Sequence, residues 1–175
     1  MYNSRLLSFV TSLLLALTVS AVDARTDDEI ATDIVARLRS NVSGNYVFNT
    51  VTVSSENGKV VLSGKVRDAY IFDRAQKAAE KIEGVVSIDN QIQVLPVSIQ
   101  DDRLRAIIYR RLSNDGLLFA YFLGRDPGIQ IIVENSRVTL LGQVNNNVER
   151  VRAGSRIREL SGVLRVDNQI KVVRG

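Results

Sequence analysis

The stretches "SIDNQIQV" (Ser87–Val94) and "RVDNQIKV" (Arg165–Val172) place the run Asp-Asn-Gln-Ile twice in one chain. A shift of 78 residues lays the second stretch on the first, and it also aligns "GKVVLSGKV" (58–66) with "SRVTLLGQV" (136–144). These segments agree at alternating positions and at a shared glycine, which composition alone does not produce. The chain is therefore an internal duplication.

A second similarity lies upstream of each copy. The segment "DDEIATDIVARL", which begins at Asp27, resembles "DDRLRAIIYRRL", which begins at Asp101, at a shift of 74 residues. Because this shift is smaller than 78, we expect the second copy to carry four additional residues between its first helix and its first strand.

The N-terminal residues have the pattern of a targeting segment. An apolar run, Leu6–Val19, follows the single cation Arg5, and small residues follow the run. The run is short for a membrane span and is typical of a secretory signal peptide. We predict a signal peptide at 1–24, a first module at 25–95, a linker at 96–100 and a second module at 101–175.

The composition excludes most catalytic and metal-binding chemistry. The chain has no Cys and no His, so disulfides, a lipid-modified Cys, the commonest general base and the usual nitrogen and sulfur metal ligands are missing. No glycine-rich phosphate loop or nucleophile elbow is present. We predict a protein that is not an enzyme and has no cofactor, no metal site and no nucleic acid partner. We also predict that it is periplasmic, secreted across the inner membrane, and not a lipoprotein.

The charge is concentrated in the second half of the chain. Residues 101–175 contain 13 Lys and Arg against 8 Asp and Glu, whereas residues 25–100 contain 9 against 10. A basic module indicates an anionic partner, such as the head groups of phospholipids. An ordinary solvated basic surface remains the alternative.

Each copy predicts the order helix, strand, strand, helix, strand. In the first copy a capping box begins a helix at Thr26, "YVFNTVTV" (46–53) reads as a strand, and Asn57-Gly58 reads as a tight hairpin. The second copy has Ser136 in place of Gly58, which predicts a different turn. The order predicts an α+β fold of two tandem αββαβ modules, each a small mixed three-stranded sheet with two helices on one face.

Glycine and asparagine recur at matched positions and predict structural roles. A glycine within the second strand leaves room for close packing or a bulge, and a later glycine can end the second helix. On the closing strand, Asp and Asn side chains point to opposite faces, so they cannot form a local carboxylate cluster. The residues with predicted structural roles are Gly64, Gly84, Asn90, Gly142, Gly162 and Asn168.

These features together resemble the BON module, the family named for a bacterial osmotically inducible periplasmic protein and nodulation proteins. The resemblance rests on the valine-rich second strands and on the closing segments "IEGVVSIDNQIQV" and "LSGVLRVDNQIKV". It implies an α/β sandwich module of the bacterial envelope that is non-enzymatic and binds phospholipid or mediates protein contacts. Some two-module relatives are lipoproteins, but without Cys this chain is more similar to the soluble osmotically inducible kind.

The inserted segment of the second copy, "GLLFAYFLGRDPG" (116–128), is the main candidate site. Apolar side chains beside cations are how peripheral proteins enter a membrane interface. The alternative is that the run packs in the interior, as an extension of the first helix or between the modules. The candidate lipid or partner contacts are Arg110, Arg111, Leu117, Leu118, Phe119, Tyr121, Phe122, Leu123 and Arg125.

An arginine series on the second helix of the second copy is a further candidate. It consists of Arg150, Arg152, Arg156 and Arg158, and Glu149 and Glu159 can neutralise part of it. A solvated helix face with ordinary ion pairs explains the series without a ligand.

The sequence therefore predicts a protein that binds anionic phospholipid or a membrane surface through its second module and supports envelope integrity or stress tolerance, including osmotic stress. The alternative function is a protein-protein interaction or structural adaptor module in an envelope assembly. The predicted partners are the membrane surface and envelope proteins.

Overall fold

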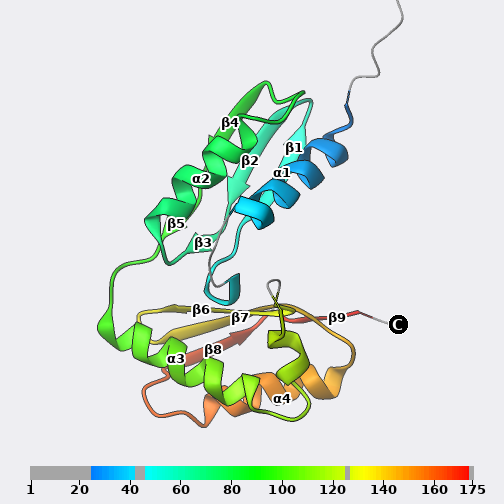
Figure 1. The fold of residues 1–175 in the computed structure, drawn as a ribbon. Coiled ribbons are helices and arrows are strands. Elements are labelled where there is room, and N and C mark those ends of the chain that lie inside the picture. Colours follow the sequence, from blue (N-terminus) through cyan, green and yellow to red (C-terminus); the bar gives the residue numbers. More distant parts are fainter. Residues whose placement is uncertain (1–24, 42–45, 125–126, 174–175) are drawn as a thin grey trace, which may run out of the picture.

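The computed structural model describes residues 25–41, 46–124 and 127–173 (Figure 1). The predicted signal peptide (1–24) and the candidate contact Arg125 lie outside these ranges. The described chain forms two αββαβ modules in tandem, so the predicted fold class is confirmed. No helix within the described ranges is long and apolar enough to cross a membrane.

The first module is a mixed sheet with two helices on one face (Figure 1). Strand β2 lies in the middle, antiparallel to β1 and parallel to β4, and the short pair β3-β5 is also parallel. Its elements are α1 (Asp27–Asn41), η1 (Tyr46–Phe48), β1 (Thr52–Glu56), β2 (Lys59–Ser63), β3 (Lys65–Val66), α2 (Ala69–Ala79), β4 (Ser87–Asn90) and β5 (Gln93–Val94).

The second module repeats this topology, with β7 between antiparallel β6 and parallel β8, and with β9 also parallel to β7. Helices α3 and α4 cover one face of the sheet, and the other face is turned toward the first module (Figure 1). Its elements are α3 (Ile99–Ser113), η2 (Phe119–Phe122), β6 (Ile129–Glu134), β7 (Arg137–Val144), α4 (Asn147–Arg158), β8 (Arg165–Asn168) and β9 (Lys171–Val172).

The start of α1 follows from the capping box. The Thr26 hydroxyl accepts the Glu29 amide proton at 3.3 Å, and the Glu29 carboxylate accepts the Thr26 amide proton at 2.9 Å. These reciprocal bonds satisfy two amides that the first helical turn cannot satisfy itself. The apolar stripe of α1 then packs on the sheet, and its buried members are Ile30, Ile34 and Leu38.

The modules share an apolar contact that the sequence does not predict. Val47, from η1 of the first module, is buried in the core of the second module. Beside it the Phe48 ring packs edge-on against Tyr109 at 6.1 Å, and Tyr109 packs edge-on against Phe122 at 5.6 Å between ring centroids. The predicted strand at 46–53 is therefore wrong in its first half, because residues 46–48 form η1, from which Val47 and Phe48 enter the second core.

The two hairpin turns have the same backbone conformation. Asn57 and Gly58 have φ of 52° and 72°, and Asn135 and Ser136 have φ of 50° and 60°. Positive φ at both central residues is the signature of a type I′ turn, so the prediction of a different second turn is wrong. The reason lies in Asp101 of α3, whose carboxylate accepts the amide protons of Asn135 at 2.9 Å and Ser136 at 2.8 Å.

The first module has the same carboxylate clamp. Asp27, at the position equivalent to Asp101, accepts the amide protons of Asn57 at 2.7 Å and Gly58 at 2.9 Å, and also the hydroxyl of Ser55. The Ser55 hydroxyl and the two amides hold the pKa of Asp27 below its usual value. In each module, one carboxylate therefore ties the first helix to the tip of the hairpin.

The repeated asparagines hold the second helix beside the closing strand. The Asn90 amide donates to the Phe72 carbonyl at 3.2 Å, and the Asn168 amide donates to the Arg150 carbonyl at 2.7 Å. The repeated glycines Gly84 and Gly162 have φ of 90° and 88°. Helix α2 already ends at Ala79, so Gly84 lies in the turn after the helix rather than directly at its end.

The glycine within the second strand is required by close backbone packing. Gly142 has φ of 111°, and a Cβ placed there would lie 2.1 Å from the Gly128 carbonyl oxygen. Gly64, its counterpart, has φ of 125°, and a Cβ there would lie 2.2 Å from the Thr50 carbonyl oxygen. No other residue type fits without movement of the adjacent backbone.

Substituting Gly142 with Ala should therefore destabilise the second module. We expect Gly142→Ala to lower the free energy of unfolding by about 3 kcal/mol, from backbone strain and from the clash. Urea denaturation measures the loss. The matched control is Gly116→Ala, because nothing lies within 4 Å of a Cβ at Gly116. Equal losses in the two variants would contradict the requirement for glycine.

The Asp27 clamp should make stability depend on acid pH. Because the pKa of Asp27 is lowered in the folded state, its stabilising effect is present above about pH 4 and is lost as the pH falls through the folded-state pKa. We expect Asp27→Asn to be less stable than the unsubstituted protein at pH 7, and the difference to shrink below about pH 4. Urea denaturation across this range checks the trend, and a difference that does not change with pH would argue against the clamp.

Candidate functional site

The structure divides the apolar run of the inserted segment between the interior and the surface. Leu118 and Phe122 are buried in the core of the second module. The side chains left outside are Leu117 (48% exposed), Phe119 (48%) and Leu123 (63%). Only these three of the five can contact a surface or a partner without unpacking the core, and we call them the exposed apolar edge.

Tyr121, the remaining ring of the run, joins η2 to the start of α4. Its hydroxyl donates to the Glu149 carboxylate at 2.6 Å and accepts the Asn145 amide proton at 3.0 Å. Burial and the bond to Glu149 raise the pKa of Tyr121, and the Tyr121 hydroxyl in turn lowers the pKa of Glu149. The polar tip of Tyr121 therefore fixes the position of η2.

A buried carboxylate forms ion pairs with two of the four arginines in the α4 series. Asp115, whose side chain is 1% exposed, accepts from Nε of Arg152 at 2.8 Å and from Nε of Arg156 at 2.9 Å. It also accepts the Leu117 amide proton at 3.1 Å. Burial by itself would raise the pKa of Asp115, but these donors outweigh burial and hold the pKa below its usual value.

Asp115 is the residue of this region that sequence analysis misses. Its neighbours in sequence show only an acidic residue between a helix and an apolar run, and its two arginines come from α4, far along the chain. The glutamates expected to neutralise the series are engaged elsewhere, because Glu149 binds Tyr121 and Glu159 binds Arg111.

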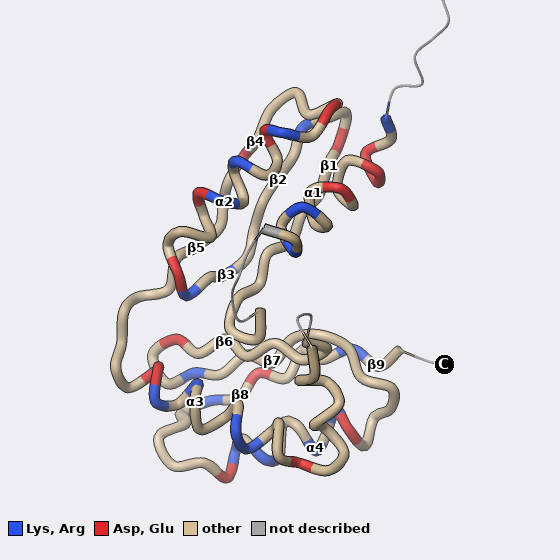
Figure 2. Tube along the Cα trace, viewed as in Figure 1, with Lys and Arg blue, Asp and Glu red and all other residues tan. Residues whose placement is uncertain are grey.

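A basic hollow lies beside Asp115, between α3 and α4. We call this cavity of about 470 Å³ the arginine pocket. Figure 2 shows Lys and Arg segments gathered along these two helices. The guanidinium of Arg111 contacts Glu159 at 3.3 Å. That of Arg110 donates to the Ala106 carbonyl at 3.4 Å, its one hydrogen bond among the residues that the structure describes. The pocket is lined by Ile107, Arg110, Arg111, Asn114, Asp115, Arg156 and Leu160.

The chemistry of the arginine pocket is that of an anion site. Three guanidinium groups, from Arg110, Arg111 and Arg156, line the pocket together with one carboxylate, that of Asp115. Glu159, outside the lining, pairs with Arg111. Guanidinium groups suit phosphate and carboxylate ligands because they donate several hydrogen bonds in one plane. Within the described residues, no group of three or more acidic side chains is placed to hold a metal ion.

The chain belongs to the BON domain family. The family model matches residues 26–96 and 100–174, so nearly all of the described chain consists of two BON domains. The fold and the internal repeat thus identify this chain as a protein with two BON domains.

Among curated proteins, the chain is similar to the outer membrane lipoprotein DolP of Haemophilus influenzae. The two are 30% identical over 121 residues, which cover 66% of this chain and 59% of that protein. The chain thus matches less than two thirds of the length of this relative.

Among solved structures, the chain resembles CdsD, a structural protein of the type III secretion system of Chlamydia trachomatis. The identity is 13%, the match covers 82% of this chain and 92% of that one, and the TM-score is 0.30. A second structure, of the C-terminal domain of CdsD, gives 12% identity and a TM-score of 0.29, with 83% and 98% of the two chains covered. At these TM-scores the likeness supports no further conclusion.

The comparison with DolP corrects the predicted localisation. The sequence predicts a periplasmic protein that is not a lipoprotein, whereas this relative is an outer membrane lipoprotein. The prediction rests on the absence of Cys, which by itself assigns no location. We therefore regard that prediction as wrong.

Loss of the Asp115 carboxylate should loosen the inserted segment. We expect Asp115→Ala to lower the free energy of unfolding by about 1–3 kcal/mol, because the Leu117 amide and two guanidinium groups lose their acceptor. Urea denaturation measures the effect. Asp89→Ala is the control, since Asp89 is exposed and its side chain accepts a hydrogen bond from the neighbouring Gln91. A loss no larger than in the control would show that Asp115 does not hold the segment.

Proposed function

We propose that this protein is a non-enzymatic component of the bacterial envelope that binds anionic phospholipid at a membrane surface through its second module, and thereby supports envelope integrity under stress. The observation that carries the proposal is the exposed apolar edge next to the arginine pocket. The two are joined through Asp115, which bonds both the Leu117 amide and Arg156.

The apolar edge supplies the hydrophobic part of the association. Each of its leucine and phenylalanine side chains is about half exposed or more, so each has apolar surface left to bury in the boundary between head groups and acyl chains. Full burial of such a side chain contributes about 1.5–3 kcal/mol, and half-exposed side chains contribute correspondingly less. Three of them are sufficient for a reversible peripheral contact but not for permanent insertion.

The arginine pocket supplies the electrostatic part. A cation near an anionic leaflet contributes about 1 kcal/mol, and the contribution fades within a Debye length of about 8–10 Å. Arg110 and Arg111 are exposed on the last turn of α3. The proposal therefore requires both parts, and it predicts that salt weakens the association.

The comparisons support an envelope role in general terms. Membership of the BON domain family and similarity to an outer membrane lipoprotein both favour a protein associated with the envelope.

A protein-binding function is the second candidate, and a repeated feature favours it. Val86 and Leu164 stand at equivalent positions just before β4 and β8, and they are 75% and 77% exposed. Both strands form an edge of their sheet, and edge strands can pair with an extended segment of a partner.

Vesicle co-sedimentation tests the proposed function with a variant for each part of the site. Protein spanning residues 25–175 is mixed with vesicles of phosphatidylglycerol or of phosphatidylcholine, at low and at high salt. We expect binding only to the anionic vesicles, weaker at high salt. Phe119→Ser and Arg111→Gln should each reduce the bound fraction severalfold, because each removes one part of the contact.

Val86→Ser is the matched control for this test, since Val86 is an exposed apolar residue of the first module. Phe122→Ser is unsuitable because Phe122 lies in the core and its loss would unfold the module. If the protein binds neither kind of vesicle, or if Phe119→Ser and Val86→Ser bind equally, the phospholipid site is refuted. That result would then leave the protein-binding function as the better candidate.

A further inference from the structure

Strands β8 and β9 form one edge of the second sheet, and we call residues 165–173 the outer edge. Within the described residues, β8 is the last strand on this side, and β9 continues it along β7 at the same offset. The amides of Gln169 and Val173 donate to the Leu140 and Val144 carbonyls of β7 at 2.8 and 2.9 Å. Because backbone groups of alternate residues point to opposite sides of a strand, the intervening residues point theirs outward. These outward residues are Val166, Asn168, Ile170 and Val172.

The outward backbone groups can accept a further strand. One of them, the Ile170 amide, donates to the side-chain oxygen of Asn168 in its own chain, at a long 3.3 Å. An added strand would extend the ladder of backbone hydrogen bonds across the outer edge. The side chains along the edge indicate which strand fits.

The order of side chains along the outer edge is complementary to itself. If a second copy pairs antiparallel with Gln169 opposite Gln169, each residue faces the one equally far from Gln169 on the other side. Asp167 of each copy then faces Lys171 of the other, and Val166 faces Val172. Two-fold symmetry forms each of these pairs twice. Opposite charges and apolar side chains that face each other across strands stabilise a sheet.

The backbone and the charges select the same register. With Gln169 at the centre, outward residues face outward residues, so their amides and carbonyls can bond. Asp167 and Lys171 then form a non-hydrogen-bonded pair, in which the side chains are closest. A centre at Asn168 would instead place Arg165 opposite Lys171, and a centre at Ile170 would leave both Asp167 and Lys171 opposite uncharged residues.

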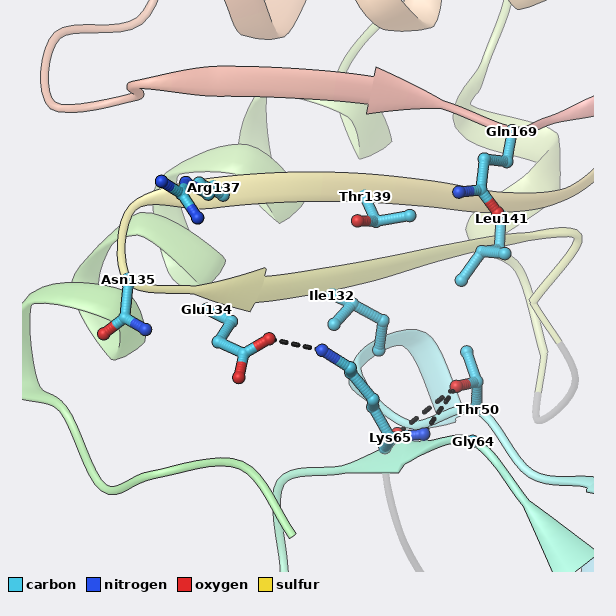
Figure 3. Close-up of a pocket in the computed structure, with 10 residues that line it drawn as sticks. All are labelled: Thr50, Gly64, Lys65, Ile132, Glu134, Asn135, Arg137, Thr139, Leu141 and Gln169. Carbon is cyan, nitrogen blue, oxygen red and sulfur yellow. Dashed lines mark hydrogen bonds and ion pairs between the residues drawn. The ribbon is translucent and has the colours of Figure 1, made fainter. Parts of the chain in front are cut away.

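Both charges are available for a partner. Asp167 and Lys171 are exposed and lie on the open face of the sheet, as does Gln169, which lies beside Leu141 of β7 (Figure 3). Asp167 accepts from the neutral Gln169 amide at 2.6 Å, and within the described residues Lys171 has no hydrogen bond or ion pair. A lysine on an edge strand discourages pairing when its charge would lack a partner. The self-complementary order supplies that partner.

Helix α4 adds apolar surface beside the outer edge. Gly154 lies so close to β8 that a Cβ there would be 2.9 Å from Nδ2 of Asn168. Val151, one turn earlier on the same side of the helix, is 49% exposed. A second sheet joined at the outer edge brings its own α4 to this side, so Val151 of each copy can bury apolar surface there.

The internal duplication provides a comparison within the chain. At the shift of 78 residues, Asp167 corresponds to Asp89, but Lys171 corresponds to Gln93 and Val151 to Asp73. The edge of the first module therefore has the carboxylate without the cation, and an acidic residue in place of the exposed valine. Self-complementarity is confined to the second module.

We propose that two copies of this protein pair through the outer edge, antiparallel and centred on Gln169, so that their second sheets form one continuous sheet across a two-fold axis. The inference gives the protein-binding candidate a partner, a second copy of this chain. It does not depend on the phospholipid contact, because the arginine pocket lies between α3 and α4. The paired segment is short, so the dimer is a reversible one.

Sedimentation velocity of protein spanning residues 25–175, over a wide range of concentration, tests the pairing. We expect a reversible equilibrium between monomer and dimer, weaker at high salt. Lys171→Glu places two pairs of like charges in the interface and should raise the dissociation constant about tenfold or more. Gln93→Glu is the matched control, since it makes the equivalent change in the first module, and it should leave the dissociation constant unchanged.

A charge exchange distinguishes a lost contact from a misfolded variant. Asp167→Lys should weaken the dimer as Lys171→Glu does, because it sets two cations opposite each other. When the Asp167→Lys and Lys171→Glu variants are mixed, each cross-strand pair again joins a cation to a carboxylate. A dimer should then form between the two variants although neither dimerises well alone.

A single introduced thiol tests the register, since the chain has no Cys. In the Gln169→Cys variant the two thiols face each other across the two-fold axis, with Cα atoms about 4.5 Å apart, within the range of a disulfide. Oxidised glutathione should convert this variant to a covalent dimer. Gln91→Cys, at the equivalent position of the first module, should remain monomeric under the same conditions.

The outcomes that overturn the proposal are distinct. A protein that stays monomeric at every concentration, or a dimer that Lys171→Glu leaves unchanged, would exclude pairing through the outer edge. Association beyond the dimer, or equal cross-linking of Gln91→Cys and Gln169→Cys, would overturn the assignment to the second module alone. Failure of vesicle binding leaves these tests unaffected, because they use no membrane.

Discussion

The burial of Val47 and Phe48 in the core of the second module is the contact on which the rest of the arrangement depends. A module of about 70 residues buries a limited share of its surface, so an additional shared core is a substantial gain. The contact holds the first module against the open face of the second sheet and brings Lys65 to Glu134. A cleft lined by Thr50 and Lys65 of the first module and by Glu134 and Arg137 of the second lies between the modules.

The same contact determines how the inserted segment is used. Phe122 faces inward toward Tyr109 and Phe48, and Leu118 packs in the same core. Neighbouring residues of the short helix then face outward, because a 3₁₀ helix has about three residues per turn. The segment is therefore neither wholly a membrane contact nor wholly interior packing. The sequence allows either surface exposure or interior packing for this run, and the structure shows both, each for different side chains.

The fold could be predicted from the sequence because its determinants are local and occur twice. Three local patterns each predict the backbone conformation of their own segment: the capping box at Thr26, the alternation around Gly64 and the Asn-Gly turn. Because the chain is duplicated, each of these predictions can be compared with the matching segment of the other copy. Two of the errors have a common cause. The departure of residues 46–48 from the strand and the type I′ turn at Ser136 both depend on groups far away in sequence, in the second core and at Asp101.

For the candidate site, the sequence predicts only that apolar and basic residues lie close together along the chain. Which side chains of the run are exposed depends on the packing of η2 against α3, and no local pattern in the sequence encodes it. The role of Asp115 was likewise hidden, since its partners are on α4. The location was mispredicted for a different reason: the absence of one residue type was treated as if it assigned a compartment.

Helix η2 carries the exposed Phe119 and the buried Phe122 only three residues apart. The first links η2 to whatever lies outside the protein, and the second links it to the first module through Tyr109 and Phe48. A force applied to the surface of η2 therefore has a path to the first module through rings that pack edge to face, in addition to the path along the chain.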